Sequence, residues 1–122
     1  MAAEDTITVG LTEDTHLMLQ KLKEDNVFDE MMDAYRLGIG LAIARGEIAP
    51  EGLKTKTFVN AGSLDPDGSI RNMIIELYPQ SASKPYSVAE RLAEWGVTEL
   101  GRRHETGHLR FTEVFETATG AA

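Results

Sequence analysis

The amino-acid sequence predicts a mainly α-helical domain that begins with one short β-strand and continues with about four helices. Three observations lead to this fold class: side chains alternate at 6–11, a long apolar run with small residues fills 29–45, and two amphipathic stretches follow later. The chain has 122 residues, which is the size of one ordinary domain. We expect a single domain over 1–122, with strand-helix-helix at 6–46, a loop with a possible short strand at 47–69, helices at 70–116 and a frayed tail at 117–122.

Residues 6–11 alternate between polar and apolar side chains, which is typical of a half-buried strand. The side chains that we expect to face the core are Ile7, Val9 and Leu11. Thr12 is the expected N-cap of the first helix, which extends to about Glu24. The inner face of this helix is predicted to consist of Leu17, Met18, Leu22 and the stem of Lys21.

The segment from Asp29 to Arg45 is predicted to be a central helix that ends at Gly46. Ala34, Gly38 and Ala42 fall four residues apart and form a ridge of small side chains on one helix face. A glycine inside a helix costs about 1 kcal/mol relative to alanine, so we expect a closely packed backbone to offset that cost. The backbone can belong to the same chain or to a second copy, and we favour a homodimer because most soluble oligomers have two-fold symmetry. The predicted interface consists of Met31, Ala34, Tyr35, Gly38, Leu41 and Ala42.

Two further helices are predicted after a turn at 65–68, whose proline and glycine favour a tight bend. Ser69 is the expected cap of the first, which ends near Tyr78. Its apolar positions are Ile70, Met73, Ile74 and Leu77. Ser87 and Glu90 have the S-x-x-E spacing of a capping box, which predicts the start of a helix that continues to about Arg103. A last amphipathic segment contains Leu109, Phe111, Val114 and Phe115.

Composition narrows the range of functions. The net charge of −8 argues against strong non-specific DNA binding, which depends on lysine and arginine. The chain contains no cysteine, so a disulfide framework and a thiolate zinc site are excluded. No apolar run approaches the roughly 18 residues of a membrane span, and the first residues lack the features of a secretory signal. We therefore expect a cytoplasmic protein with no membrane partner.

The string from His104 to His108 has the spacing H-E-x-x-H. On a helix, residues i and i+4 share a face, so two imidazoles can hold one zinc ion beside a glutamate that acts as general base. The string resembles the signature of zinc metalloproteases, and the resemblance implies His104 and His108 as zinc ligands and Glu105 as the catalytic base. The alternative is a polar helix end with cationic side chains at the negative end of the helix dipole. We favour the helix end, and accordingly assign no catalytic residue, no metal and no cofactor.

The sequence has one concentration of cationic side chains, which consists of Arg102, Arg103 and His104, with Arg91 and Arg110 nearby. Such a cluster can meet phosphate or an acidic partner. The alternative is a solvated face with local salt bridges, which is the more common role of surface charges.

The order strand, helix, turn, helix over residues 6–45 resembles the ribbon-helix-helix family. In that family two strands pair across a dimer and their outward side chains read DNA in the major groove. The resemblance implies that Thr6, Thr8 and Gly10 point outward, and that the two threonines could contact bases.

Two longer strings, NVFDEMMDAYRLGIGLAIARGEIAP and AERLAEWGVTEL, are similar to small accessory proteins of bacterial DNA-phosphorothioation (Dnd) systems. This likeness implies a DNA-modification or phage-defence context and no catalytic site. The sequence thus favours a non-catalytic, homo-oligomeric accessory or regulatory module, whose expected partners are a second copy and other proteins. The alternatives are a zinc metallohydrolase of the H-E-x-x-H type and a ribbon-helix-helix regulator that binds DNA.

Overall fold

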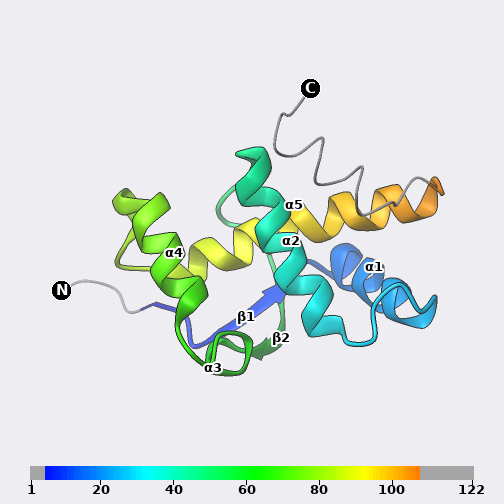
Figure 1. Ribbon diagram of the computed structural model, residues 1–122, viewed down its shortest axis with the longest axis horizontal. Helices are drawn as coiled ribbons and strands as arrows, with labels where there is room; N and C mark the ends of the chain where they lie inside the picture. The colour runs from blue at the N-terminus through cyan, green and yellow to red at the C-terminus, as the bar shows by residue number, and fades with distance from the viewer. Residues whose placement is uncertain (1–4, 108–122) are drawn as a thin grey trace.

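The computed structural model describes residues 5–107, and this part of the chain is mainly helical with a small sheet that begins near the N-terminus (Figure 1). The strands are β1 (Thr8–Leu11) and β2 (Lys56–Asn60), and they pair antiparallel. The helices are α1 (Glu13–Glu24), α2 (Met31–Arg45), α3 (Ala61–Leu64), α4 (Ser69–Leu77) and α5 (Pro85–Glu105), and a 3-10 turn η1 (Pro79–Ser81) follows α4. The fold class and the strand-helix-helix start predicted from the sequence are confirmed.

Helix α5 lies along the long axis of the molecule, and α2 crosses it (Figure 1). At the crossing the two backbones almost touch: a Cβ atom on Gly96 would lie 1.8 Å from the carbonyl oxygen of Gly38. Ala34 and Ala42, one turn before and after Gly38, are fully buried. The backbone that fills the predicted ridge of small residues is therefore α5 of the same chain, not that of a second copy.

The backbone of strand β1 has hydrogen-bond partners along both of its edges. One edge pairs with β2, with Val9 opposite Val59 and an irregularity between Val9 and Gly10. On the other edge the amide of Gly10 donates to Glu90 at 2.8 Å, and the amide of Thr12 donates to Glu94 at 2.9 Å. Helix α5 thus supplies carboxylates where a third strand would supply carbonyl groups.

Two expected core positions are wrong. Ile7 is 81% exposed because β1 begins at Thr8, so the alternation that buries Val9 and Leu11 does not reach it. Leu17 is 56% exposed, and α1 instead buries the face that carries Thr15 and Leu19. The hydroxyl of Thr15 donates to the buried Glu94 at 2.7 Å, and this bond to α5 fixes which face of α1 is inside.

Helix α5 begins at Pro85, two residues before the predicted capping box. Proline at the first helical position has a suitable φ and lacks the N–H that would be unsatisfied there. The first turn is capped from the far end of the chain, because the Asp5 carboxylate accepts the amides of Tyr86 at 2.8 Å and Ser87 at 3.1 Å. Glu90 does not close a capping box because its carboxylate binds β1.

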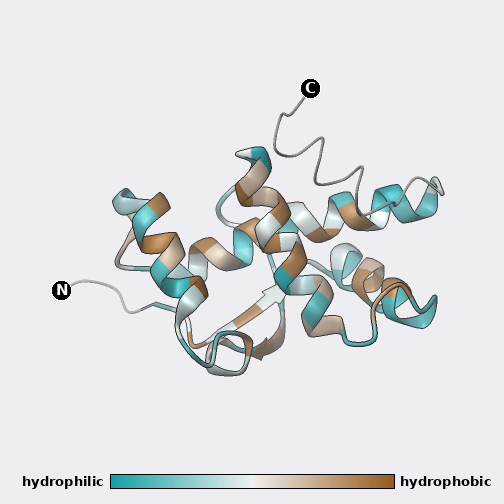
Figure 2. Ribbon diagram, in the orientation of Figure 1, coloured by the Kyte–Doolittle hydropathy of each residue, from teal (hydrophilic) through white to brown (hydrophobic). Residues whose placement is uncertain are grey.

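Helix α4 contributes one fully buried side chain to the core, and Ile70 packs against the core while partly exposed. Ile74 is fully buried, whereas Met73 is 39% and Leu77 52% exposed. Apolar residues are plentiful along both α2 and α4, and hydrophilic residues dominate the C-terminal end of α5 (Figure 2). Asp65 holds the start of α4 by accepting the amides of Ile70 and Arg71, each at 2.9 Å. None of the helices within residues 5–107 combines the length and hydropathy of a membrane span.

Replacing Gly96 by alanine is expected to lower the free energy of unfolding by at least about 3 kcal/mol. The added Cβ atom would overlap the carbonyl oxygen of Gly38, a backbone atom that cannot rotate away. Urea denaturation followed by circular dichroism measures the change. Gly62→Ala is the matched control, because a Cβ atom there meets nothing within 4 Å. A Gly96→Ala variant as stable as the wild type would contradict the close helix crossing.

Candidate functional site

The H-E-x-x-H string does not form one turn of helix in the described part of the chain. Helix α5 ends at Glu105, and Gly107 has a φ of 74°, in the left-handed region. The His104 imidazole lies 2.7 Å from the Asp25 carboxylate, and His108 lies outside the described residues. Hydrogen bonds from His104 and Lys21 lower the pKa of the Asp25 carboxyl. Within residues 5–107 no three histidine or acidic side chains are grouped as a metal site requires, and Glu105 is exposed.

The arginines of the predicted cationic patch are paired within α5. Arg102 lies 2.5 Å and Arg103 2.9 Å from the same oxygen of Glu99, whereas Arg110 lies outside the described residues. Burial raises the pKa of the Glu99 carboxyl, but the two guanidinium hydrogen bonds outweigh it, so the pKa is lower than usual. The described part of the cluster is the salt-bridged helix face that was the alternative prediction.

The residues implied by the ribbon-helix-helix resemblance are engaged within the chain. The Thr6 hydroxyl donates to the carbonyl oxygen of Thr8 at 2.5 Å, and the Gly10 carbonyl accepts the Tyr35 hydroxyl at 3.0 Å. Because β1 pairs with β2 and with α5, its edges are not open for a strand of a second copy in this structure.

The six residues of the predicted dimer interface lie mostly in the interior. Met31 is half-buried, and the other five, Ala34, Tyr35, Gly38, Leu41 and Ala42, are buried within the chain. The Tyr35 ring stacks on Phe58 with 5.3 Å between centroids, and burial raises the pKa of its hydroxyl well above the usual value. A second copy could contact α2 only on its opposite side.

That opposite side forms one wall of an apolar groove of about 400 Å³ between α2, α3 and α4. Gly40 lies in this wall, and a Cβ atom on it would meet nothing within 4 Å. Arg36 closes one part of the groove, because its Nε donates to the carbonyl oxygen of Leu64 at 2.9 Å. The apolar lining comes from Ile39, Leu64, Pro66, Ile70 and Met73.

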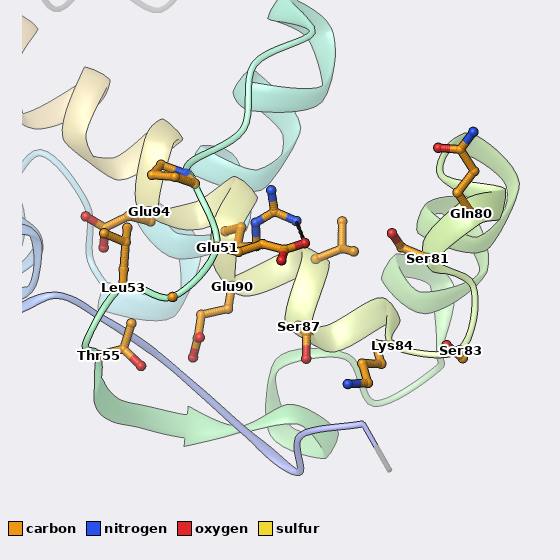
Figure 3. Close-up of a pocket in the computed structure, with 14 residues that line it drawn as sticks. Glu51, Leu53, Thr55, Gln80, Ser81, Ser83, Lys84, Ser87, Glu90 and Glu94 are labelled. Atoms are coloured by element: carbon orange, nitrogen blue, oxygen red, sulfur yellow. Dashed lines mark hydrogen bonds and ion pairs between the residues drawn. The ribbon is translucent and has the colours of Figure 1, made fainter. Parts of the chain in front are cut away.

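A second, polar cleft of about 370 Å³ lies between the start of α5, the loop before β2 and the connection after α4 (Figure 3). Figure 3 shows Glu90 and Thr55 on one side, Lys84 and Ser83 on the other, and Ser87 between them. Cationic, acidic and hydroxyl groups therefore share one concave surface, which is the usual setting of a small-molecule site.

The electrostatics of this cleft centre on Glu90. Burial raises the pKa of its carboxyl, and the charge of Glu94, one helical turn away, raises it further. Hydrogen bonds from the Gly10 amide and the Thr55 hydroxyl act in the opposite direction without cancelling the rise. Arg91 does not neutralise the carboxylate, because its guanidinium bonds to the Ala49 carbonyl oxygen at 2.9 Å.

Sequence reasoning missed both concave surfaces. Each is lined by segments far apart in the chain, so no local pattern marks it. Ser87 and Glu90 were noticed for their spacing but given a capping role.

Comparisons of the chain with protein-family models, with curated proteins and with solved structures find no match.

Replacing Glu99 by glutamine is expected to lower the free energy of unfolding at neutral pH by about 1 kcal/mol, because both guanidinium hydrogen bonds lose their charge partner. The folded-state pKa lies below the ordinary value of 4.5, so this stabilisation is present above 4.5 and disappears as the pH falls through the folded-state pKa. The free energies of unfolding of the wild type and of Glu99→Gln should therefore become equal in acid. Urea denaturation at a series of pH values measures the difference, with the exposed Glu76→Gln as control. If the difference in free energy of unfolding stayed constant across the pH series, the charged Glu99 carboxylate would not be the source of the stabilisation.

Proposed function

We propose that the protein is a non-catalytic accessory or regulatory module that assembles as a homodimer through the outer face of α2. The observation that carries this proposal is Gly40, which lies near the middle of a 15-residue helix with open space where a side chain would be. The buried acids of the described chain support a non-catalytic role, since Asp65, Glu94 and Glu99 are each occupied by hydrogen bonds that hold the fold.

Gly38 and Gly40 of α2 both weaken the helix, but they differ in the contact that offsets this loss of stability. Each is expected to cost about 1 kcal/mol relative to alanine. For Gly38 the close approach of Gly96 offsets the cost. For Gly40 nothing among residues 5–107 lies close enough to do so. A backbone from outside the chain, packed directly on Gly40, would supply the missing contact.

The surroundings of Gly40 favour an apolar partner. Leu64 and Ile39 form a buried floor, and Met73 stands 39% exposed at the rim. Ala44, one turn after the half-buried Gly40, is exposed, so the outer face of α2 carries two small residues one turn apart. Small residues at a helix crossing allow two axes to approach closely.

A second copy of the chain is the occupant that fits this face. In a two-fold arrangement, α2 of one subunit would cross α2 of the other at Gly40. The same glycine of each subunit would then lie at the crossing and allow the close approach. The net charge of −8 argues against the phosphate backbone of nucleic acid as the main partner. The likeness of residues 26–50 and 89–100 to small Dnd accessory proteins supports a place for the dimer in a DNA-modification system.

Replacing Gly40 by alanine is expected to separate assembly from folding. The substitution should raise the free energy of unfolding of the subunit by up to about 1 kcal/mol, because alanine favours the helix and the added atom has room. The same atom should weaken self-association about tenfold by keeping the two helices apart. Urea denaturation at low protein concentration measures the first effect, and sedimentation equilibrium measures the second.

Gly62→Ala is the control, because it adds the same atom in open space outside the groove. It should leave the dimer unchanged. A wild-type protein that stays monomeric at about 100 μM, or a Gly40→Ala variant that associates as tightly as the wild type, would refute the proposed dimer.

A further inference from the structure

The polar cleft is separate from the proposed dimer face, because the cleft and the α2–α4 groove share no lining residue. Arg91 and Glu51 form an ion pair and Glu94 is occupied by the fold, and the two remaining charged groups of the cleft have opposite signs and lie at opposite ends. Lys84 stands at the connection after α4, and Glu90 stands further along α5 (Figure 3). A ligand that carries a single charge would meet one favourable and one unfavourable end.

The cationic end of the cleft has unused binding capacity. Within residues 5–107 the side chains of Lys84, Ser81 and Ser83, which all line this part of the cleft, make no hydrogen bond or ion pair. The neighbouring Ser87 hydroxyl is already engaged, because it donates to the Asp5 carboxylate at 3.1 Å. An unpaired ammonium and two free hydroxyls lining the same cleft are donors of the kind that a carboxylate accepts.

The acidic end also has unused capacity. Glu94 accepts the amide of Thr12 and the hydroxyls of Thr12 and Thr15, so it is occupied by the fold. Glu90 accepts one amide, at 2.8 Å, and the Thr55 hydroxyl. Because burial and the neighbouring Glu94 disfavour its charged form, a ligand cation placed beside Glu90 would relieve this unfavourable charge.

The volume of the cleft indicates the size of the ligand. The cleft encloses about 370 Å³, which is at the lower end of the range of small-molecule pockets. An extended dipeptide separates its terminal charges by about 7 Å, a span that the flexible side chains of lysine and glutamate can close.

We propose that this cleft binds a short peptide of two or three residues, with its N-terminal ammonium at Glu90 and its C-terminal carboxylate at Lys84. The ligand is a zwitterion, so both ends of the cleft are satisfied at once. Val88 forms a buried apolar part of the wall, and Leu53 is 41% exposed beside the opening, so these two can contact the peptide side chains. Arg91, bonded to the Ala49 carbonyl and 3.5 Å from Glu51, holds the loop that closes the cleft.

The test measures the binding of Ala-Ala, Ala-Leu, Ala-Lys and Ala-Glu to the full chain by amide chemical-shift changes. Each dipeptide is compared with its N-acetylated form and its C-terminal amide. Removing either terminal charge should weaken binding to the wild type about tenfold. In Glu90→Gln, which keeps an acceptor for the Gly10 amide, N-acetylation should lose its effect while amidation keeps it. In Lys84→Gln, amidation of the C-terminus should lose its effect while N-acetylation keeps it.

Lys54→Gln is the matched control, because Lys54 is an exposed lysine in the loop before β2 whose side chain does not line the cleft. It should behave as the wild type does with every ligand. Failure of all four dipeptides to bind at about 10 mM would overturn the proposal. Capping effects that persist unchanged in both cleft variants would overturn it too, as would equal binding of inorganic phosphate or acetate alone. A Gly40→Ala variant should bind the peptides as the wild type does. A negative result for peptide binding can therefore be distinguished from a negative result for dimerisation.

Discussion

The contact between Gly38 and Gly96 determines the rest of the structure. Because neither residue has a Cβ atom, α2 and α5 cross with their backbones touching, and the side chains on either side close into one core. This crossing sets the position of α5, and α5 in turn carries the carboxylates that hold β1 and α1. The fold therefore depends on a very short distance between two helices more than on any one large apolar side chain.

Acidic side chains take the place of missing backbone partners throughout the molecule. Asp5 caps α5, Asp65 caps α4, and Glu90 and Glu94 complete the free edge of β1. A carboxylate that accepts buried amides forms a charge-assisted hydrogen bond, which is stronger than a neutral one. Some of the acidic excess of this chain is thus structural, and it also prevents the edge of β1 from pairing with foreign strands.

Local pattern was sufficient to predict the mainly helical class, the N-terminal strand and the end of α2 at Gly46, because each depends on residues close in sequence. It indicated the second strand only as a possibility within 47–69. It was not sufficient for contacts between distant residues. The sequence singled out Gly38 but could not show that Gly96 faces it, so the choice between α5 and a second copy stayed open. Ser87 and Glu90 have capping-box spacing, yet Asp5 caps the helix and Glu90 binds a strand 80 residues away. The polar cleft could not be predicted, since its lining comes from three separate segments.

The dependence of β1, α1 and α2 on α5 has a consequence during synthesis on the ribosome. The first two helices emerge early, but the helix that supplies their buried partner at Gly96 and their carboxylates at Glu90 and Glu94 is the last described element to be made. Until α5 has left the exit tunnel, the small-residue face of α2 and the edge of β1 have no intramolecular cover. Folding of residues 5–107 therefore waits until α5 has been synthesised, and the nascent strand-helix-helix segment is the form that a chaperone would meet.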